Sequence, residues 1–230
     1  MSADLSIILP AYLEEENLRI LLPRITSEVR NLTKNYEIIV VDTESPLDGT
    51  QEVCKENNVI YINRLGGDFY GDAIRTGILH SRGKYIIFMD ADGSHRPEFI
   101  HNLYNERQNY DIVIASRYVP GGHTENLKTL ILMSKIVNLG YSLVLNIDCK
   151  DVSNSFKLYN GNILRSLDLK CKNFDIVEEI LYKFIRKKKD TKILEIPFSF
   201  KKRMFGETKR NLLAFIFSYF FTLIKLRIMS

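Results

Sequence analysis

The sequence lacks the features that mark several large classes of protein. Its three cysteines, Cys54, Cys149 and Cys171, are widely spaced, so they suggest neither a zinc site nor a disulfide framework, and we interpret them as reduced thiols of a cytosolic protein. No uninterrupted apolar run reaches the roughly 20 residues that a membrane-spanning helix needs. The segment Asp4–Pro10 has neither the basic region nor the cleavage site of a signal peptide, and we expect none.

A large net charge is also missing. The 230 residues carry a formal net charge of +4, which does not indicate nucleic acid as a partner, and we expect none. Lysine and arginine are nevertheless concentrated in the last third of the chain, from Arg186 onward. Such a bias suits phosphate groups or an anionic membrane surface, although a solvated basic face is an equally ordinary explanation.

Short apolar strands alternate with helices over the first 116 residues. Helices are expected around Leu18–Val29, over Gln51–Asn57 and Phe69–Ser81, and from Pro97 onward. The expected strands are Leu5–Leu9, Tyr36–Val41, Val59–Ile62, Tyr85–Met89 and Asp111–Ser116. This alternation predicts an α/β protein with an open, Rossmann-like, mostly parallel sheet that is covered by helices on both faces. We expect one catalytic domain over residues 1–210, with an apolar helix inserted over about 128–147, and an amphipathic, membrane-associated C-terminal helix over 211–230.

The stretch Asp90-Ala91-Asp92-Gly93 follows the most apolar strand directly. A strand would direct the two carboxylates of an i, i+2 pair to the same face but far apart, so the chain must turn for them to converge. In a turn they can bind one divalent cation, Mg²⁺ or Mn²⁺, together with phosphate oxygens. A solvated Asp-Gly turn is the alternative. Because Glu14, Asp42 and Arg117 follow other strands, and ligands bind at that edge of an open sheet, a nucleotide site with its metal is predicted.

A series of motifs in order resembles the inverting family 2 glycosyltransferases of the GT-A fold, and within them the polyprenyl-phosphate sugar transferases such as dolichyl-phosphate mannose synthases. The resemblance extends from about Ile7 to Lys209. The motifs are Pro10-Ala11-Tyr12 with Glu14 and Asn17, Val40-Val41-Asp42, Asp48-Gly49-Thr50, Asp90-Ala91-Asp92 with Ser94-His95-Arg96-Pro97-Glu98, Ser116 to Gly122, Asp151 to Tyr159, and Glu195-Ile196-Pro197 with Arg203, Gly206 and Lys209.

The resemblance implies the metal-dependent, inverting transfer of a hexose, of the mannose or glucose type, from a GDP- or UDP-sugar to a dolichyl or undecaprenyl phosphate. It assigns the divalent metal, Mg²⁺ or Mn²⁺, to Asp90 and Asp92. The residues that it assigns to the nucleotide sugar are Pro10, Tyr12, Glu14, Asp42, Asp90 and Lys209. Those that it assigns to catalysis are Asp92, Arg117 and Arg203.

Several positions depart from the family pattern. Thr43 stands where a second consecutive aspartate is common, and Leu47 lengthens the following loop by one residue, which leaves the choice between guanine and uracil open. Gly93-Ser94 replaces a common Leu-Gln pair, so a third metal ligand is either missing or Ser94. Asn154-Ser155-Phe156 stands in place of Ser-Gly-Phe.

The expected acceptor explains why no obvious general base is present. A phosphate monoester has a second pKa of about 6 and arrives as an anion, so positioning and charge compensation carry most of the catalysis. The four histidines lack triad-like companions, and we expect His95 to have a structural role in its turn. Glu178 and Glu179 remain candidate acids, although a solvated helix face is their default interpretation.

Two stretches, Leu130–Ile147 and Leu212–Ile228, are apolar over most of a helical circumference and carry a narrow polar stripe. We expect them to lie flat in a membrane surface, which places a peripheral protein on the cytoplasmic side. Burial in the core, a homodimer interface or a small membrane partner are the alternatives. For the chain as a whole, the alternative functions are transfer to a glycan hydroxyl and a non-catalytic, nucleotide-sugar-binding membrane subunit.

Overall fold

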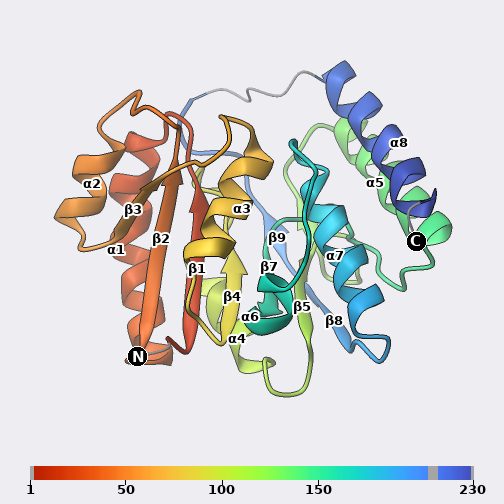
Figure 1. The fold of residues 1–230 in the computed structure, drawn as a ribbon, viewed down its shortest axis with the longest axis horizontal. Coiled ribbons are helices and arrows are strands. Elements are labelled where there is room, and N and C mark those ends of the chain that lie inside the picture. Colours follow the sequence, from red (N-terminus) through yellow and green to blue (C-terminus); the bar gives the residue numbers. More distant parts are fainter. Residues whose placement is uncertain (1–2, 207–211, 229–230) are drawn as a thin grey trace.

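A seven-stranded sheet forms the centre of the molecule, with strand order β3-β2-β1-β4-β7-β5-β8 (Figure 1). The computed structural model describes residues 3–206 and 212–228, and only the backbone of 212–218 and 220. The strands are β1 (Leu5–Pro10), β2 (Tyr36–Asp42), β3 (Ile60–Asn63), β4 (Tyr85–Phe88), β5 (Ile112–Ser116), β7 (Lys157–Asn160) and β8 (Ile193–Pro197). A separate parallel pair joins β6 (His123–Thr124) to β9 (Ser199–Phe200).

The prediction of a mostly parallel sheet is confirmed. All neighbouring strands of the large sheet run parallel except at β7, which pairs antiparallel with β4 on one side and β5 on the other. The five predicted strands lie within one residue of the observed ones. Because β7 is reversed, its first residue, Lys157, lies at the edge where the parallel strands end.

Helices cover both faces of the sheet, and strand alternation explains how the two cores are separated. Along β1, Ile8 points into one core and Ile7 and Leu9 into the other. The Ile8 core lies under α3 (Tyr70–His80), α6 (Gly161–Arg165) and α7 (Ile176–Lys187). The opposite core lies under α1 (Glu15–Leu32), α2 (Thr50–Glu56), the short 3₁₀ helix η1 (Pro97–Phe99) and α4 (Ile100–Asn105).

Two further helices, α5 (Lys128–Leu145) and α8 (Leu212–Ile228), pack against each other beside α7 (Figure 1). The Tyr141 hydroxyl donates to the Tyr219 carbonyl (2.8 Å), and Thr222 donates to Asp175. α5 ends two residues before the predicted Ile147 because Asn146 adopts the left-handed conformation, with φ 52°. Within the described residues, α5 alone is long and apolar enough to cross a membrane, judged by length and composition.

Candidate active site

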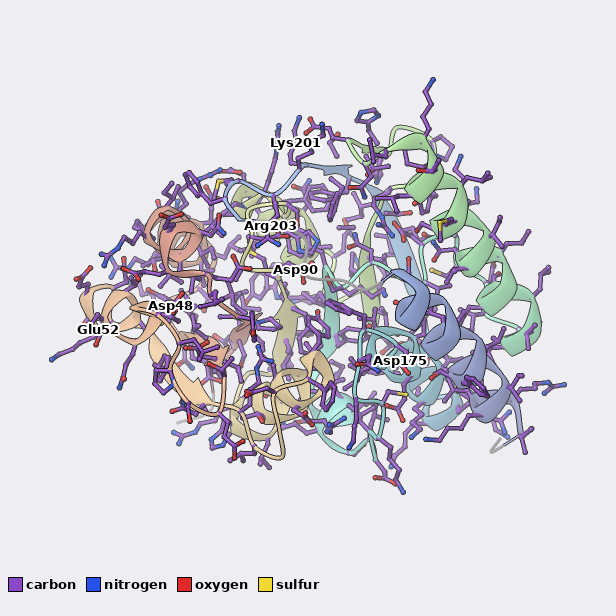
Figure 2. The ribbon with its side chains drawn as sticks, turned by 90° about the horizontal axis from the view of Figure 1, so that it is seen from above. Asp48, Glu52, Asp90, Asp175, Lys201 and Arg203 are labelled. Carbon is purple, nitrogen blue, oxygen red and sulfur yellow. The ribbon has the colours of Figure 1, made fainter. Side chains whose placement is uncertain are left out.

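The candidate site lies at the edge of the sheet where the parallel strands end. Figure 2 views the molecule onto this edge and shows Asp90 and Arg203 near its centre, Asp48 on the α2 side and Asp175 beside α8. The segment Lys201–Gly206 crosses the predicted metal-binding turn, residues 90–94. The Lys201 amide donates to the Ser94 carbonyl (3.1 Å), and the Met204 amide donates to the Asp92 carbonyl (2.8 Å).

Each aspartate of the turn has one oxygen engaged by the protein. Oδ1 of Asp90 accepts hydrogen bonds from the hydroxyls of Tyr70 (3.3 Å) and Ser155 (3.0 Å). Oδ1 of Asp92 accepts from the backbone amide (3.0 Å) and hydroxyl (2.6 Å) of Ser94. Among the described residues, Oδ2 of each carboxylate accepts no hydrogen bond; the Nε2 atom of His95 lies 3.8 Å from Asp90 Oδ2, beyond hydrogen-bonding distance.

This arrangement fits a divalent cation that is completed by its substrate. The described residues contain no cluster of three or more His, Cys, Asp or Glu side chains that could enclose a metal. Two carboxylates with one unengaged oxygen each are what Mg²⁺ or Mn²⁺ uses when phosphate oxygens and water supply the other ligands. Ser94 directs its hydroxyl to Asp92, so in this structure it orients the Asp92 carboxylate.

His95 has the structural role that was expected of it. Its ring is fully buried and stacks on Phe156, with centroids 4.7 Å apart. Nδ1 accepts a hydrogen bond from the Asp90 amide (2.9 Å), which closes the turn. Burial lowers the pKa of His95, so the imidazole is held neutral.

Arg203 and Glu14 form an ion pair beside the turn, with Nη2 and Oε1 2.7 Å apart. Asn17 donates to the second Glu14 oxygen (2.5 Å) and accepts from the Phe205 amide (3.1 Å). The Arg203 Nε donates to the Phe205 carbonyl (2.8 Å). Burial raises the pKa of Glu14 more than these partners lower it.

The residues predicted to line a base and ribose pocket lie at or just beyond the carboxyl ends of β1 and β2. Asp42 is buried at the end of β2 and accepts a hydrogen bond from the Tyr61 hydroxyl (3.1 Å); burial raises its pKa. Pro10 ends β1, and Tyr12 is exposed just beyond it. The structure therefore brings Pro10, Tyr12, Glu14 and Asp42 to one side of the metal-binding turn, whereas Lys209 lies outside the described residues.

The other side of the turn is occupied by Arg117. Its Nε and Nη2 form a paired contact with both oxygens of the buried Asp151 (2.9 and 2.7 Å), and Nη2 also reaches the Ser153 hydroxyl (3.0 Å). Ser153 is tied to Asn138 of α5, whose Oδ1 accepts from the Ser153 amide (2.8 Å). The Arg117 side chain is only 9% exposed, so Asp151 fixes its orientation.

Glu178 and Glu179 are not solvated, and the structure gives neither a place at the candidate site. Glu178 lies inside the core of the sheet face covered by α7, where burial raises its pKa to about 8. Glu179 is buried as well and accepts hydrogen bonds from the amides of Lys170 and Cys171. The expectation of a solvated helix face is wrong for both. In the first turn of α7, Glu178 is enclosed by the core and Glu179 is covered by the segment that contains Lys170 and Cys171.

Sequence reasoning missed Tyr70, Ser155 and Asn138. Tyr70 lies in the first turn of α3 and belongs to no motif. In the sequence, Ser155 stands out only as a departure from the family pattern, and Asn138 only as one of the polar residues within the apolar stretch Leu130–Ile147. Part of the stripe faces the candidate site, since Asn138 and Ser134 both contact the Ser153 hydroxyl, whereas Ser142 donates to the Ile147 carbonyl (2.7 Å) just after α5.

Comparisons with known proteins agree with this geometry. The sequence model of Glycosyl transferase family 2 matches residues 6–168. A Dolichol-phosphate mannosyltransferase of Pyrococcus furiosus is 35% identical over 89% of this chain, which spans only 58% of that protein. An Undecaprenyl-phosphate mannosyltransferase of Micrococcus luteus is 30% identical over 89% of this chain and 86% of its own length.

Solved structures establish the fold. Glucosyl-3-phosphoglycerate synthase of Mycobacterium tuberculosis, in a complex with Mn²⁺, UDP and glucosyl-3-phosphoglycerate, superimposes with a TM-score of 0.72 at 17% identity, covering 97% of this chain and 80% of that one. Its complex with Mg²⁺ and UDP gives 0.73 at 16% identity, covering 97% and 79%. The predicted GT-A fold is thereby confirmed.

Proposed function

The chain belongs to glycosyl transferase family 2, and from this premise we propose that it transfers a hexose from a GDP- or UDP-sugar to a polyprenyl phosphate. The mannosyltransferases of Pyrococcus furiosus and Micrococcus luteus, whose names specify dolichol phosphate and undecaprenyl phosphate, support this acceptor class and favour mannose. One observation on this chain supports a lipid acceptor: hydrogen bonds connect the candidate site to α5, a helix with an exposed apolar side.

That junction is the contact from Arg117 through Ser153 to Asn138. The guanidinium donates to the Ser153 hydroxyl, which also accepts from Asn138 (3.1 Å). On the far side of α5 from Asn138, four apolar residues are exposed at spacings of four, three and four residues: Leu132, Ile136, Leu139 and Leu143. They form one apolar stripe. In this proposal the acceptor tail lies along the stripe and its phosphate extends past α5 to Arg117.

In this proposal the acceptor phosphate attacks the anomeric carbon, and the nucleoside diphosphate leaves from the opposite face. The acceptor is already an anion, so no side chain has to remove a proton. Asp90 and Asp92 would hold a divalent cation, which would compensate the charge that develops on the leaving group. Arg203 exchanges its contact with Glu14 for a phosphate, and Arg117, oriented by Asp151, holds a second one at the acceptor side.

We further propose that α5 and α8 lie in the headgroup layer of a membrane. On α8, Phe221, Ile224 and Ile228 are exposed together with the cationic Lys225 and Arg227. An exposed apolar surface that is rimmed by positive charge suits the anionic cytoplasmic leaflet. We therefore place the protein at this leaflet as a peripheral protein.

The test is an acceptor and donor panel with the purified protein. GDP-mannose, GDP-glucose, UDP-glucose and UDP-mannose are incubated with Mn²⁺ or Mg²⁺ and either undecaprenyl phosphate, dolichyl phosphate or a mannose oligosaccharide. We expect a glycolipid that is stable to alkaline phosphatase and labile to mild acid, with one donor strongly preferred. Transfer to the oligosaccharide alone would establish the hydroxyl-acceptor alternative, and donor binding without any transfer would establish the non-catalytic one.

A further inference from the structure

Asp90 is held by hydroxyl groups that come from two distant parts of the chain. Its Oδ1 accepts two hydroxyl hydrogen bonds, from Tyr70 (3.3 Å) and Ser155 (3.0 Å), and its own amide donates to His95 (2.9 Å). The three supporting residues come from α3, from the segment before β7 and from the metal-binding turn itself. The side chain is nevertheless 23% exposed, so it reaches the solvent of the site from a fixed base.

The supporting side chains are themselves held by aromatic packing. The Tyr70 ring stacks on Phe174, with centroids 4.3 Å apart and planes at 21°. Phe174 belongs to the segment before α7, whose Lys172 carbonyl accepts from the Gly71 amide (2.7 Å). On the other side, Ser155 precedes Phe156, which is buried and stacks on His95. Packing therefore fixes the position of the Tyr70 ring and of the backbone that carries Ser155.

We propose, on the basis of the proposed function, that Tyr70 and Ser155 are positioning residues for the cation and the donor diphosphate. By occupying Oδ1 from two directions they fix the plane of the Asp90 carboxylate, and Oδ2 is then the oxygen that faces the metal. Rotation about the last side-chain bond would exchange the two oxygens only by breaking both hydrogen bonds. A ligand that is oriented in advance loses less conformational freedom when the metal binds.

The partial exposure of these side chains indicates that their hydrogen bonds contribute more to metal binding than to the stability of the fold. Tyr70, Ser155 and Asp90 are all half-buried, so water can satisfy their polar groups in any variant. The stack on Phe174 uses the ring of Tyr70 and not its hydroxyl. Removal of either hydroxyl should consequently leave the stability of the fold almost unchanged while weakening the metal.

The test is a Mn²⁺ titration of wild type, Tyr70→Phe, Ser155→Ala and the double variant. Free Mn²⁺ is followed by its electron paramagnetic resonance signal, with GDP and then UDP present. We expect the apparent Mn²⁺ dissociation constant to rise about tenfold in each single variant, the range typical of groups that orient metal ligands. The melting temperature should stay within the spread set by Tyr104→Phe, which removes the hydroxyl of a buried tyrosine on α4.

Ser155→Thr keeps a hydroxyl at the same position and should retain Mn²⁺ affinity near that of wild type. This variant shows whether the loss of affinity in Ser155→Ala comes from the missing hydroxyl or from a general effect of substitution at this position. Unchanged Mn²⁺ affinity in Tyr70→Phe and Ser155→Ala would overturn the inference while leaving the proposed function in place. A wild-type protein that binds neither Mn²⁺ nor nucleotide would instead overturn the proposed function, on which this inference rests.

Discussion

Asp92 has a structural role and a proposed role in metal binding, and a single substitution can separate the two. Its Oδ1 closes the turn by accepting from Ser94, and its charge is proposed to hold the cation. Asp92→Asn keeps the accepting oxygen and removes the charge, so we expect transfer to fall by about 100-fold or more with an unchanged melting temperature. Steady-state kinetics over a range of Mn²⁺ concentrations checks this. The metal assignment would be contradicted if Asp92→Asn were as active as wild type, or if the wild-type protein kept its full activity in excess EDTA.

Arg203 tests whether geometry or charge matters at the donor. Its guanidinium uses separate nitrogens for Glu14 and the Phe205 carbonyl, which a lysine ammonium cannot reproduce in the same plane. For Arg203→Lys we expect kcat/KM for the nucleotide sugar to drop about 10- to 100-fold. Arg96→Lys, at an exposed position after the metal-binding turn, should be neutral. If both lysine variants are fully active, Arg203 contributes only a diffuse positive charge.

Leu13 adopts a backbone conformation that its side chain disfavours. Its φ is 56°, in the left-handed region, and the side chain is 43% exposed, so little packing compensates for the strain. Asparagine tolerates this region several-fold better than leucine. We expect Leu13→Asn to stabilise the fold by about 0.5 to 1 kcal/mol, measured by urea denaturation. The reverse change at a matched position, Asn58→Leu with φ 53°, should destabilise the fold by a similar amount.

How much of the site was predictable at this scale depends on sequence separation. Asp90, Asp92, Glu14 and Asp42 could be found because each follows an apolar strand, and parallel strands end at one edge. Tyr70 and Ser155 could not, because their meeting with Asp90 depends on tertiary packing. Ser155 lies 65 residues away from Asp90 in the chain, and no local pattern records that proximity.

At the scale of elements, the sheet shows the same limit. The strands before residue 116 are predictable from runs of apolar residues between helices. β7 and β8 are not, since Lys157-Leu158-Tyr159-Asn160 is short and polar at both ends, and its lysine is buried. The buried Lys157 side chain is accommodated in part by the Val152 carbonyl, which accepts a hydrogen bond from it (2.7 Å). A hydrogen bond to a backbone carbonyl depends on the fold and cannot be predicted from the types of the residues.

The first turn of α7 makes stability depend on pH. Burial raises the pKa of Glu178 from an ordinary 4.5 to about 8, and the groups facing it are Lys157 of β7, Tyr219 of α8 and Asp175. Between these two pKa values the folded protein holds a proton that the unfolded chain releases, so stability falls as pH rises from about 4.5 to about 8. Glu178→Gln removes this dependence.

We therefore expect Glu178→Gln to gain stability relative to wild type between pH 5 and pH 8, by an amount on the order of a few kcal/mol. Urea denaturation of both proteins at the two pH values measures the difference directly. Glu56→Gln, at an exposed position at the end of α2, is the control and should show no such gain. A constant difference between Glu178→Gln and wild type across the range would mean that Glu178 is charged in the folded state.

At the scale of the whole molecule, membrane attachment can be separated from donor binding. Leu139→Ser with Leu143→Ser removes two leucines of α5 that are 60% and 71% exposed. We expect vesicle binding to weaken by about tenfold or more, with donor affinity unchanged. The matched control is Leu47→Ser with Leu79→Ser, which are 53% and 69% exposed elsewhere on the surface. Sedimentation with vesicles containing anionic lipid provides the measurement, and equal binding by both double variants would remove α5 from the membrane contact.

The reversed strand β7 also determines the order in which the molecule can be completed during its synthesis. β4 pairs with β7 through Tyr85↔Asn160 to Phe88↔Lys157, so one side of β4 has no partner until about 70 further residues have been made. At translation rates of roughly 5 to 20 residues per second this interval lasts about 4 to 14 seconds. Throughout it the nascent chain presents an open apolar strand edge, a template for aggregation. Chaperone dependence of the newborn chain should therefore peak before residue 160 leaves the ribosome.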